Sequence, residues 1–321
     1  MSNMQALVTG GAGFIGHKVV EKLLEKNYFV RVVDNLSKGE AKNLEKHFSN
    51  PNFEFVKTDL LNLEAAKQVM EGCDICFHLA AKIGGIGYFH KYPATILRDN
   101  NVLTLNIFEA ARDSNTKIVY VSSSMVFERT NQFPTPETAV DTSPPPLTAY
   151  GFSKLVGEYI ARAYNAEFGI QFVIGRPFNA YGPGEIPGDF VGYAHVIPDL
   201  VKKILSGQYP LQILGSGEQI RCYTYVDDIA EGLVLIGEKA KNDDFNIADP
   251  RPTSVKELTD ILWKICGRKE ELKFEHVEPF EFDVQKRIPD ISKIQKKFGW
   301  KPKVSLEEGL KITVEWLRKK L

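Results

Sequence analysis

The amino-acid sequence predicts an α/β protein built on a doubly wound parallel sheet, with a smaller C-terminal lobe. Short apolar runs alternate with amphipathic segments along the first half of the chain, which is the pattern of buried parallel strands separated by helices. The length of 321 residues suits about two domains or lobes, since one domain takes roughly 150 residues. After Arg176, prolines and glycines break the alternation into loops and short elements, which indicates a second lobe.

The predicted elements follow one another in regular order. Strands are expected at residues 5–9, 29–33, 53–56, 75–79, 118–121 and 172–174. Helices are expected at 15–26, 101–112 and 150–168. The first helix places five apolar residues on one face: Ile15, Val19, Val20, Leu23 and Leu24. We assign residues 1–176 and the returning segment 223–247 to the first domain, and residues 177–222 and 248–321 to the second lobe.

Composition and charge exclude several classes of protein. Forty Lys and Arg against 41 Asp and Glu leave a net charge of −1, so there is no broad basic field for nucleic acid or an anionic membrane. Apolar runs all fall short of the ~18 residues that span a bilayer. The start of the chain, Met1–Gln5, lacks a charged segment followed by an apolar signal core, so we expect a cytoplasmic protein.

Two features suggest metal chemistry, but the sequence favours a simpler interpretation of each. Cys73-x-x-Cys76 has the spacing of a zinc or redox pair, but it has no partner pair and leads into an apolar strand. We interpret both as buried, reduced cysteines. Asp227-Asp228 begins a predicted helix, where carboxylates suit the helix dipole. No metal site is therefore expected.

A glycine-rich loop joins the first strand to the first helix. Gly10, Gly13 and Gly16 are three residues apart, which allows a tight turn and close approach of the backbone to a pyrophosphate at the helix N-terminus. Asp34 ends the second strand, where a carboxylate can accept the ribose hydroxyls of adenosine and repel a 2′-phosphate. The loop and the carboxylate together predict NAD rather than NADP as cofactor.

Tyr150 and Lys154 lie four residues apart and so share one face of the third predicted helix. A cation beside a phenol lowers the pKa of that phenol, so the pair suits proton transfer near neutral pH. A solvated surface pair is the alternative that spacing alone leaves open.

These motifs resemble those of the extended short-chain dehydrogenase/reductase family of nucleotide-sugar epimerases and dehydratases, whose phosphate loop is Gly-x-x-Gly-x-x-Gly. The resemblance covers nearly the whole chain. Further matching segments are Asp59-Leu60, His78-Leu79-Ala80-Ala81, Asn101-Val102 and Arg176–Pro183. It implies an NAD-binding Rossmann domain, a substrate-binding lobe, and a homodimer joined through the helices near 101–112 and 150–168.

The resemblance also implies roles for individual residues. Ser123, Tyr150 and Lys154 match the catalytic serine, tyrosine and lysine. The residues implied to bind the cofactor are Gly10, Gly13, Phe14, Ile15, Gly16, Asp34, Asn35, Asp59, Leu60, Leu79, Ala80, Ala81, Asn101, Tyr150, Lys154 and Pro177. The residues implied to contact the substrate are Lys82, Ser123, Ser124, Met125, Tyr150, Asn179, His195, Val196, Arg221 and Arg287.

Two positions after Ser123 separate the reaction types of the family. Dehydratases carry Asp-Glu where this chain has Ser124-Met125, and fucose synthases and GDP-mannose 3,5-epimerases carry a cysteine in place of Met125. A thioether cannot exchange a proton. The favoured function is therefore C4 inversion of a nucleotide-diphosphate hexose, with UDP favoured, through a transient 4-keto sugar.

The sugar nucleotide needs cations for its diphosphate, because guanidinium groups match phosphate oxygens. Arg221 and Arg287 resemble the phosphate-binding arginines of the family, and Asn179 its diphosphate-contacting asparagine.

Two segments keep two other functions open. Ala194–Pro198 and Lys82–Gly87 are similar to fucose synthase segments, so His195 is an acid, a substrate contact or an inert loop residue. The alternatives are a GDP-sugar 4-keto reductase or an epimerase at a carbon next to the ketone. A dinucleotide-binding protein without catalysis is the alternative outside enzymes.

Overall fold

The computed structural model of the chain describes residues 4–188, 193–281 and 283–321. At the centre of these residues is a seven-stranded sheet in the order β11-β6-β5-β4-β1-β2-β3, in which every neighbouring pair is parallel. This order confirms the predicted doubly wound sheet. The strands are β1 (Gln5–Thr9), β2 (Phe29–Asp34), β3 (Phe53–Lys57), β4 (Ile75–His78), β5 (Lys117–Val121), β6 (Phe172–Pro177) and β11 (Asp243–Ile247).

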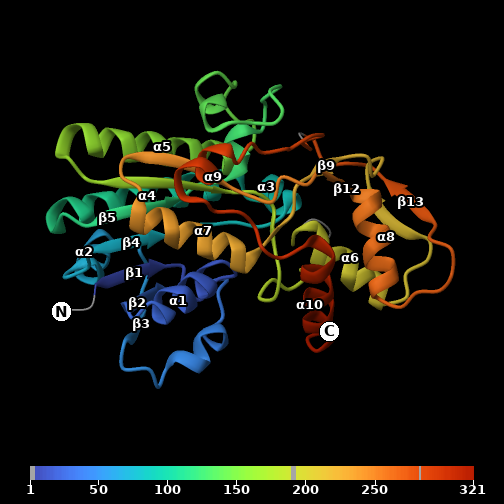
Figure 1. Cartoon of the computed structure of the whole chain (residues 1–321), viewed down its shortest axis with the longest axis horizontal. Helices are drawn as coiled ribbons and strands as arrows, with labels where there is room; N and C mark the ends of the chain where they lie inside the picture. Colours follow the sequence, from blue (N-terminus) through green and yellow to red (C-terminus); the bar gives the residue numbers. More distant parts are fainter. Residues whose placement is uncertain (1–3, 189–192, 282) are drawn as a thin grey trace.

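Helices cover both faces of the sheet (Figure 1). One face carries α2 (Leu63–Met70), α4 (Pro93–Ser114) and α5 (Ala149–Phe168); the other carries α1 (Gly16–Glu25) and α7 (Val226–Lys239). The side chains of neighbouring residues in β1 point to opposite faces of the sheet, as strand geometry requires. Leu7 lies in the core under α2, α4 and α5, whereas Ala6 and Val8 lie in the core under α1 and α7.

The helix α4 begins eight residues earlier than predicted. Pro93 occupies its first turn, where the missing N–H of proline costs nothing, and Asn115 closes it in the left-handed conformation. The prediction began at Asn101 because the apolar period is weak before that residue. Asn101 therefore lies in the middle of the helix rather than at its start.

A third apolar core builds the second lobe, at the right of Figure 1. It is formed by α6 (Val196–Leu205), β8 (Leu211–Leu214), α8 (Val255–Ile265), β13 (Phe274–Val277) and α10 (Leu306–Arg318). One segment assigned to this lobe packs elsewhere: Ile291, Ile294 and Trp300, in and around α9 (Ser292–Phe298), are buried in the sheet core. Their apolar side chains cover β11, the edge strand of the sheet.

The cysteines and the hydropathy of the helices agree with the sequence analysis. All four cysteines are buried, and burial raises the pKa of the Cys73 and Cys76 thiols. Within 4–188, 193–281 and 283–321, no helix has the length and hydropathy to cross a bilayer.

Candidate active site

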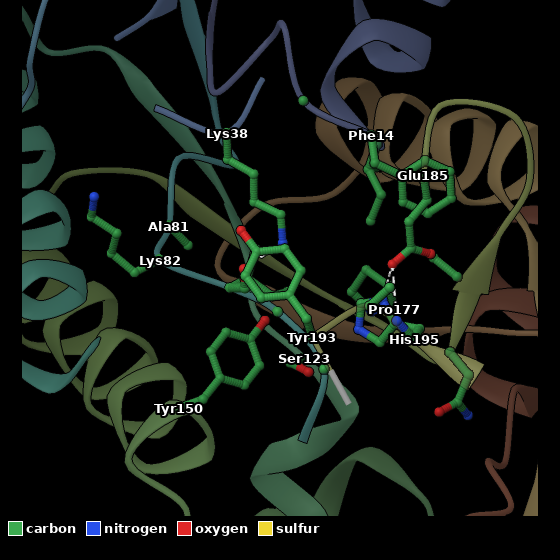
Figure 2. Close-up of a pocket in the computed structure, with 18 of the residues that line it drawn as sticks. Phe14, Lys38, Ala81, Lys82, Ser123, Tyr150, Pro177, Glu185, Tyr193 and His195 are labelled. Atoms are coloured by element: carbon green, nitrogen blue, oxygen red, sulfur yellow. Dashed lines mark hydrogen bonds and ion pairs between the residues drawn. The ribbon is translucent and has the colours of Figure 1, made fainter. Parts of the chain in front are cut away.

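A cavity of about 920 Å³ lies between the carboxyl ends of the sheet strands and the second lobe (Figure 2). It is lined by all the residues that the sequence predicted to contact cofactor or substrate, except Asn101. These residues come from loops far apart in the sequence. The parallel sheet brings them together because it places the ends of its strands at one edge.

Asn100, not Asn101, supports the wall of this cavity. The Asn100 side chain accepts the Lys82 N–H at 2.7 Å, and its amide donates to the Lys82 carbonyl at 3.2 Å and to the Ser153 hydroxyl at 3.1 Å. The next residue points elsewhere on the helix, since adjacent residues face different directions. In Figure 2 the Lys82 side chain itself extends away from Tyr150 and His195.

The glycine loop after β1 forms a cradle with no room for a side chain at Gly10 or Gly16. Gly10 has φ of +69°, and a Cβ on Gly16 would lie 2.1 Å from the Gly10 carbonyl oxygen. The helix α1 starts without a side-chain cap and without acidic residues in its first turn. The His17 and Lys18 N–H groups donate to the Gly13 and Ile15 carbonyls, each at 3.1 Å. The N–H groups suited to bind phosphate oxygens are therefore those of the loop just before them, with the positive end of the helix dipole beside them.

Asp34, at the end of β2, is anchored beside this cradle. Its carboxylate accepts the Ala12 N–H at 3.1 Å and the Leu36 N–H at 2.8 Å. Burial raises the Asp34 pKa, and these two hydrogen bonds oppose that rise. Asn35 donates to Asp59 at 3.1 Å in the adjacent wall. The fixed carboxylate suits a neutral pair of ribose hydroxyls and not a phosphate.

Tyr150 and Ser123 face one another across the floor of the cavity (Figure 2). Tyr150 lies in the first turn of α5, which Thr148 caps by accepting the Gly151 N–H at 3.1 Å. The phenol ring stacks on Phe89, with 4.7 Å between the ring centroids. Burial raises the pKa of Tyr150, whereas hydrogen bonding to Ser123 and the charge of Arg287 lower it.

Lys154 lies one turn further along α5 and is also buried. Its ammonium donates to the Val121 carbonyl at 2.8 Å and lies 5.9 Å from the centre of the Tyr150 ring. Burial lowers the Lys154 pKa to about 8. The sequence predicted that Lys154 lowers the pKa of Tyr150. In the structure the Tyr150 pKa is raised instead, because desolvation of the phenol outweighs the Ser123 hydrogen bond and the charge of Arg287.

Two arginines approach the cavity from the second lobe. Arg287 donates to the Asn179 side chain at 3.3 Å and contacts the Met125 sulfur at 2.8 Å, while its buried Nε has no protein partner. Arg221 pairs with Asp283 at 3.0 Å. Burial, and then the charge of Arg221, lower the Arg287 pKa to about 9. Both guanidinium groups gain from an anion placed between them.

His195 lies on the opposite wall and makes a side-chain contact with Glu185 that sequence reasoning missed. Its Nδ1 contacts the carboxylate of Glu185, which also accepts the His195 N–H at 3.3 Å (Figure 2). Lys38 and Tyr193 also line this side: the Lys38 ammonium lies 5.7 Å from the Tyr193 ring. No spacing rule links Glu185 to His195, because neither residue lies in a helix or strand whose period would relate them.

Metal ligation is not supported by the described part of the chain. It contains no group of three or more His, Cys, Asp or Glu side chains placed to hold an ion. Asp227 and Asp228 lie in the first turn of α7, as expected, where Asp227 pairs with Lys18 at 3.2 Å and Asp228 accepts the Val304 N–H at 3.0 Å.

Comparison with known proteins places these features in a family. A model of the NAD-dependent epimerase/dehydratase family matches residues 6–248. The chain belongs to this family. The protein is therefore an enzyme that acts on nucleotide sugars. Its Rossmann fold is like that of the extended short-chain dehydrogenases/reductases.

Individual relatives match over nearly the full length. A protein of Methanocaldococcus jannaschii, provisionally named a UDP-glucose 4-epimerase, is 37% identical over 97% of this chain and 98% of its own. The crystal structure of Thermotoga maritima UDP-glucose 4-epimerase with UDP-glucose has a TM-score of 0.88 and 37% identity, with 99% of each chain covered. UDP-glucuronic acid decarboxylase 1 of Xenopus tropicalis is 31% identical over 98% of this chain and 72% of its own.

The cofactor of this epimerase/dehydratase family member is NAD. The loop of Gly10, Gly13 and Gly16 lines the cavity and fits its pyrophosphate, since Gly16 packs against the Gly10 backbone too closely for a Cβ and the turn stays tight. Asp34 would hold the adenosine ribose, and Tyr150 and Lys154 line the cavity where the nicotinamide half would lie. When bound, NAD accepts a hydride from a sugar carbon and can return it.

Proposed function

We propose that this protein is an NAD-dependent epimerase that inverts C4 of a UDP-hexose through a transient 4-keto sugar. The observation that carries the proposal is the set of groups around Ser123: Tyr150 can move a proton, and Met125 cannot. The UDP-glucose 4-epimerase relatives, at 37% identity, support UDP-glucose or UDP-galactose as substrate.

The proposed mechanism needs one proton-transfer group and one hydrogen-bond donor at the reacting oxygen. Ser123 donates a hydrogen bond to the C4 oxygen of the sugar. Tyr150 removes the proton of the C4 hydroxyl as the ketone forms. Lys154 keeps a positive charge beside the phenol and so favours its ionised form. Tyr150 returns the proton after the keto sugar has turned its other face to the cofactor.

The two arginines would hold the part of the substrate that does not react. We propose that Arg221 and Arg287, with Asn179, bind the diphosphate. The Arg287 guanidinium is buried and donates to Asn179, but its Nε has no protein partner and can bind a phosphate oxygen. A fixed diphosphate and a loosely held hexose would let the keto sugar rotate without leaving. In this proposal the sheet domain holds NAD and the second lobe holds the sugar nucleotide.

The second candidate function is chemistry at a carbon next to the ketone, and the His195–Glu185 pair favours it. A carboxylate on Nδ1 orients an imidazole as an acid or base. For C4 inversion, His195 contributes only to binding.

We therefore expect His195→Ala to raise KM more than it lowers kcat, since it removes an interaction common to the bound states. Met125→Cys, measured alongside, should change turnover little because no proton leaves carbon. If His195 is an acid for an enolate, the same His195→Ala change costs kcat ~10²-fold or more with KM unchanged. Steady-state kinetics at saturating and limiting substrate separate the two outcomes.

We propose that two copies of the chain associate through α4 and α5. Apolar side chains on these helices are exposed: Leu105, Phe152, Tyr159 and Phe168. Tyr159 is 68% exposed, and exposed apolar patches on helices mark protein–protein interaction sites. Light scattering should give a dimer mass of about twice 36.1 kDa, and a monomer at micromolar concentration contradicts the proposal.

A substrate panel tests the reaction class. The purified protein should interconvert UDP-glucose and UDP-galactose without added NAD, because the hydride returns to the sugar in every cycle. GDP-sugars with NADPH test the reductase alternative, and UDP-glucuronic acid tests the decarboxylase activity named for relatives. Release of CO₂ or net consumption of NADPH contradicts the epimerase proposal, and binding of NAD without any turnover indicates a non-catalytic protein.

A further inference from the structure

A buried ion pair lies directly under the proposed catalytic residues. Arg176, on β6, is fully buried, and it donates to both carboxylate oxygens of Glu158, at 2.8 and 2.6 Å. Glu158, on α5, is only 1% exposed. Removing two charges from water is costly, and a hydrophobic pair of the same size often serves stability equally well. Stability alone therefore does not explain this pair.

Glu158 also binds the residue next to the predicted catalytic serine. The Ser122 hydroxyl donates to Glu158 at 2.6 Å, and the Ser122 N–H donates to the Gly175 carbonyl at 2.8 Å. Holding Ser122 against Glu158 and against the Gly175 carbonyl fixes the backbone just before Ser123. It therefore helps to set the position of the Ser123 hydroxyl, which hydrogen-bonds with Tyr150.

The same face of α5 carries Tyr150, Lys154 and Glu158, which follow each other at intervals of four residues. Two of them are tied to consecutive positions at the end of β5. Lys154 donates to the Val121 carbonyl at 2.8 Å, and Glu158 accepts from Ser122. These two contacts fix the register of the helix against the strand, and so the position of the phenol against the serine hydroxyl.

Glu158 also acts on the charge of Lys154. Burial lowers the Lys154 pKa to about 8, and the Glu158 carboxylate opposes this effect. The other titratable groups that face Lys154 are Tyr150, Tyr120 and His78. Burial lowers the His78 pKa to about 3, so His78 is neutral at physiological pH, and both phenols are neutral there too. Glu158 supplies the negative charge that keeps the ammonium protonated.

We propose that Glu158, held by Arg176, is a positioning residue for catalysis: through Ser122 it orients Ser123, and through its charge it keeps Lys154 an ammonium. This inference rests on the proposed roles of Ser123, Tyr150 and Lys154. Glu158 does not line the cavity and touches no reacting atom.

The far end of the network offers a matched control. Arg176 also contacts Asp244, on β11, at 2.7 Å, and Asp244 in turn pairs with Lys293 at 2.8 Å. Asp244→Asn thus removes one carboxylate from the same arginine, together with a contact to Arg162 of α5 at 3.5 Å, but it keeps the Glu158 carboxylate and its hydrogen bond from Ser122. A purely structural role predicts similar effects at both positions.

The test compares Glu158→Gln with Asp244→Asn in the full-length protein, using UDP-glucose turnover between pH 6 and 10 and thermal unfolding. We expect Glu158→Gln to lower kcat about tenfold or more, a part of the ~10²–10⁴ that a direct acid–base group contributes, with KM within about threefold. The alkaline limb of the kcat profile should move about one pH unit toward acid, because the lysine loses its negative partner. Asp244→Asn should lower the melting temperature but leave that limb in place.

Two further variants separate geometry from charge. Ser122→Ala keeps both buried charges, so it should lower kcat without moving the alkaline limb. Glu158→Asp keeps the carboxylate, so its alkaline limb should lie near that of the wild type. If Glu158→Gln does not fold, Ser122→Ala decides, and wild-type kcat in that folded variant overturns the proposal.

Other results also contradict it. An alkaline limb that does not move in folded Glu158→Gln, or one that moves equally in Asp244→Asn, makes the ion pair structural only. Failure of the proposed function is distinguished by Tyr150→Phe measured in parallel. If Tyr150→Phe turns over at the wild-type rate, the catalytic assignment is wrong. If Tyr150→Phe loses activity while Glu158→Gln has wild-type kinetics, only the role of Glu158 is rejected.

Discussion

Tyr150→Phe is expected to lower kcat by ~10²–10⁴-fold, the contribution of a positioned acid–base group. The variant keeps the ring, so its stacking on Phe89 and the packing of α5 should survive. Only the hydroxyl that faces Ser123 is lost. NAD content and substrate affinity should therefore stay close to those of the wild type, and the measurement is turnover of UDP-glucose at saturation together with bound NAD per chain.

Tyr164→Phe is the matched control for this prediction. It makes the same change on the same helix and removes one hydrogen bond, from the Tyr164 hydroxyl to Glu109 at 2.9 Å, outside the cavity. Its turnover should be close to that of the wild type. Wild-type turnover in Tyr150→Phe would remove Tyr150 from the mechanism.

Gly16→Ala should weaken NAD binding by ~10- to 100-fold, the equivalent of about 1–3 kcal/mol of overpacking. Its Cβ would lie 2.1 Å from the Gly10 carbonyl oxygen and 2.8 Å from the Gly11 Cα, and both atoms belong to the backbone. The cradle can accept the methyl group only by opening, which displaces the N–H groups that would bind the pyrophosphate. Fluorescence titration of cofactor-free protein with NAD measures the effect.

Gly13→Ala provides a graded comparison in the same loop. Its Cβ would lie 3.1 Å from the Gly10 carbonyl oxygen, so a shift of a few tenths of an ångström accommodates it. Its NAD affinity should fall between those of Gly16→Ala and the wild type. Equal affinities in all three proteins would show that this loop does not hold the cofactor as described.

The parts of the fold that could be predicted from sequence are those with strong local patterns. The first strand is an apolar run and ends in a glycine-rich turn, and its predicted limits, residues 5–9, match the structure. The start of α4 could not be predicted because its first turns, from Pro93, lack a clear apolar period. The segment around Ile294 looks like any other short helix in sequence, and only the exposed edge of β11 explains where it packs.

The candidate site shows the same division. Tyr150 and Lys154 could be paired from spacing on one helix, and the glycines from spacing in one loop. The contact of Glu185 with His195 joins two residues outside helices and strands, so no periodicity relates one residue to the other. The Glu158–Arg176 pair joins a helix to a strand, so its existence depends on how α5 lies across the sheet. Such contacts follow from packing, which the sequence does not display.

The dependence of turnover on pH also follows from the burial of Lys154. Lys154 has a folded pKa of about 8, below its ordinary value, so its ammonium is lost as the pH rises above that value. Turnover should therefore fall above about pH 8, because the phenol of Tyr150 then loses the nearby positive charge. This alkaline limb is the feature that the Glu158 variants are designed to move.

The most direct test of C4 inversion is to follow UDP-glucose in deuterated water by proton NMR, with only the NAD that copurifies with the protein. C4 inversion predicts UDP-galactose that carries no solvent deuterium at C3, C4 or C5, since hydrogen leaves C4 as a hydride and returns to the same carbon. Deuterium at C3 or C5 of the product would contradict this account and show that the enzyme enolises the keto sugar instead.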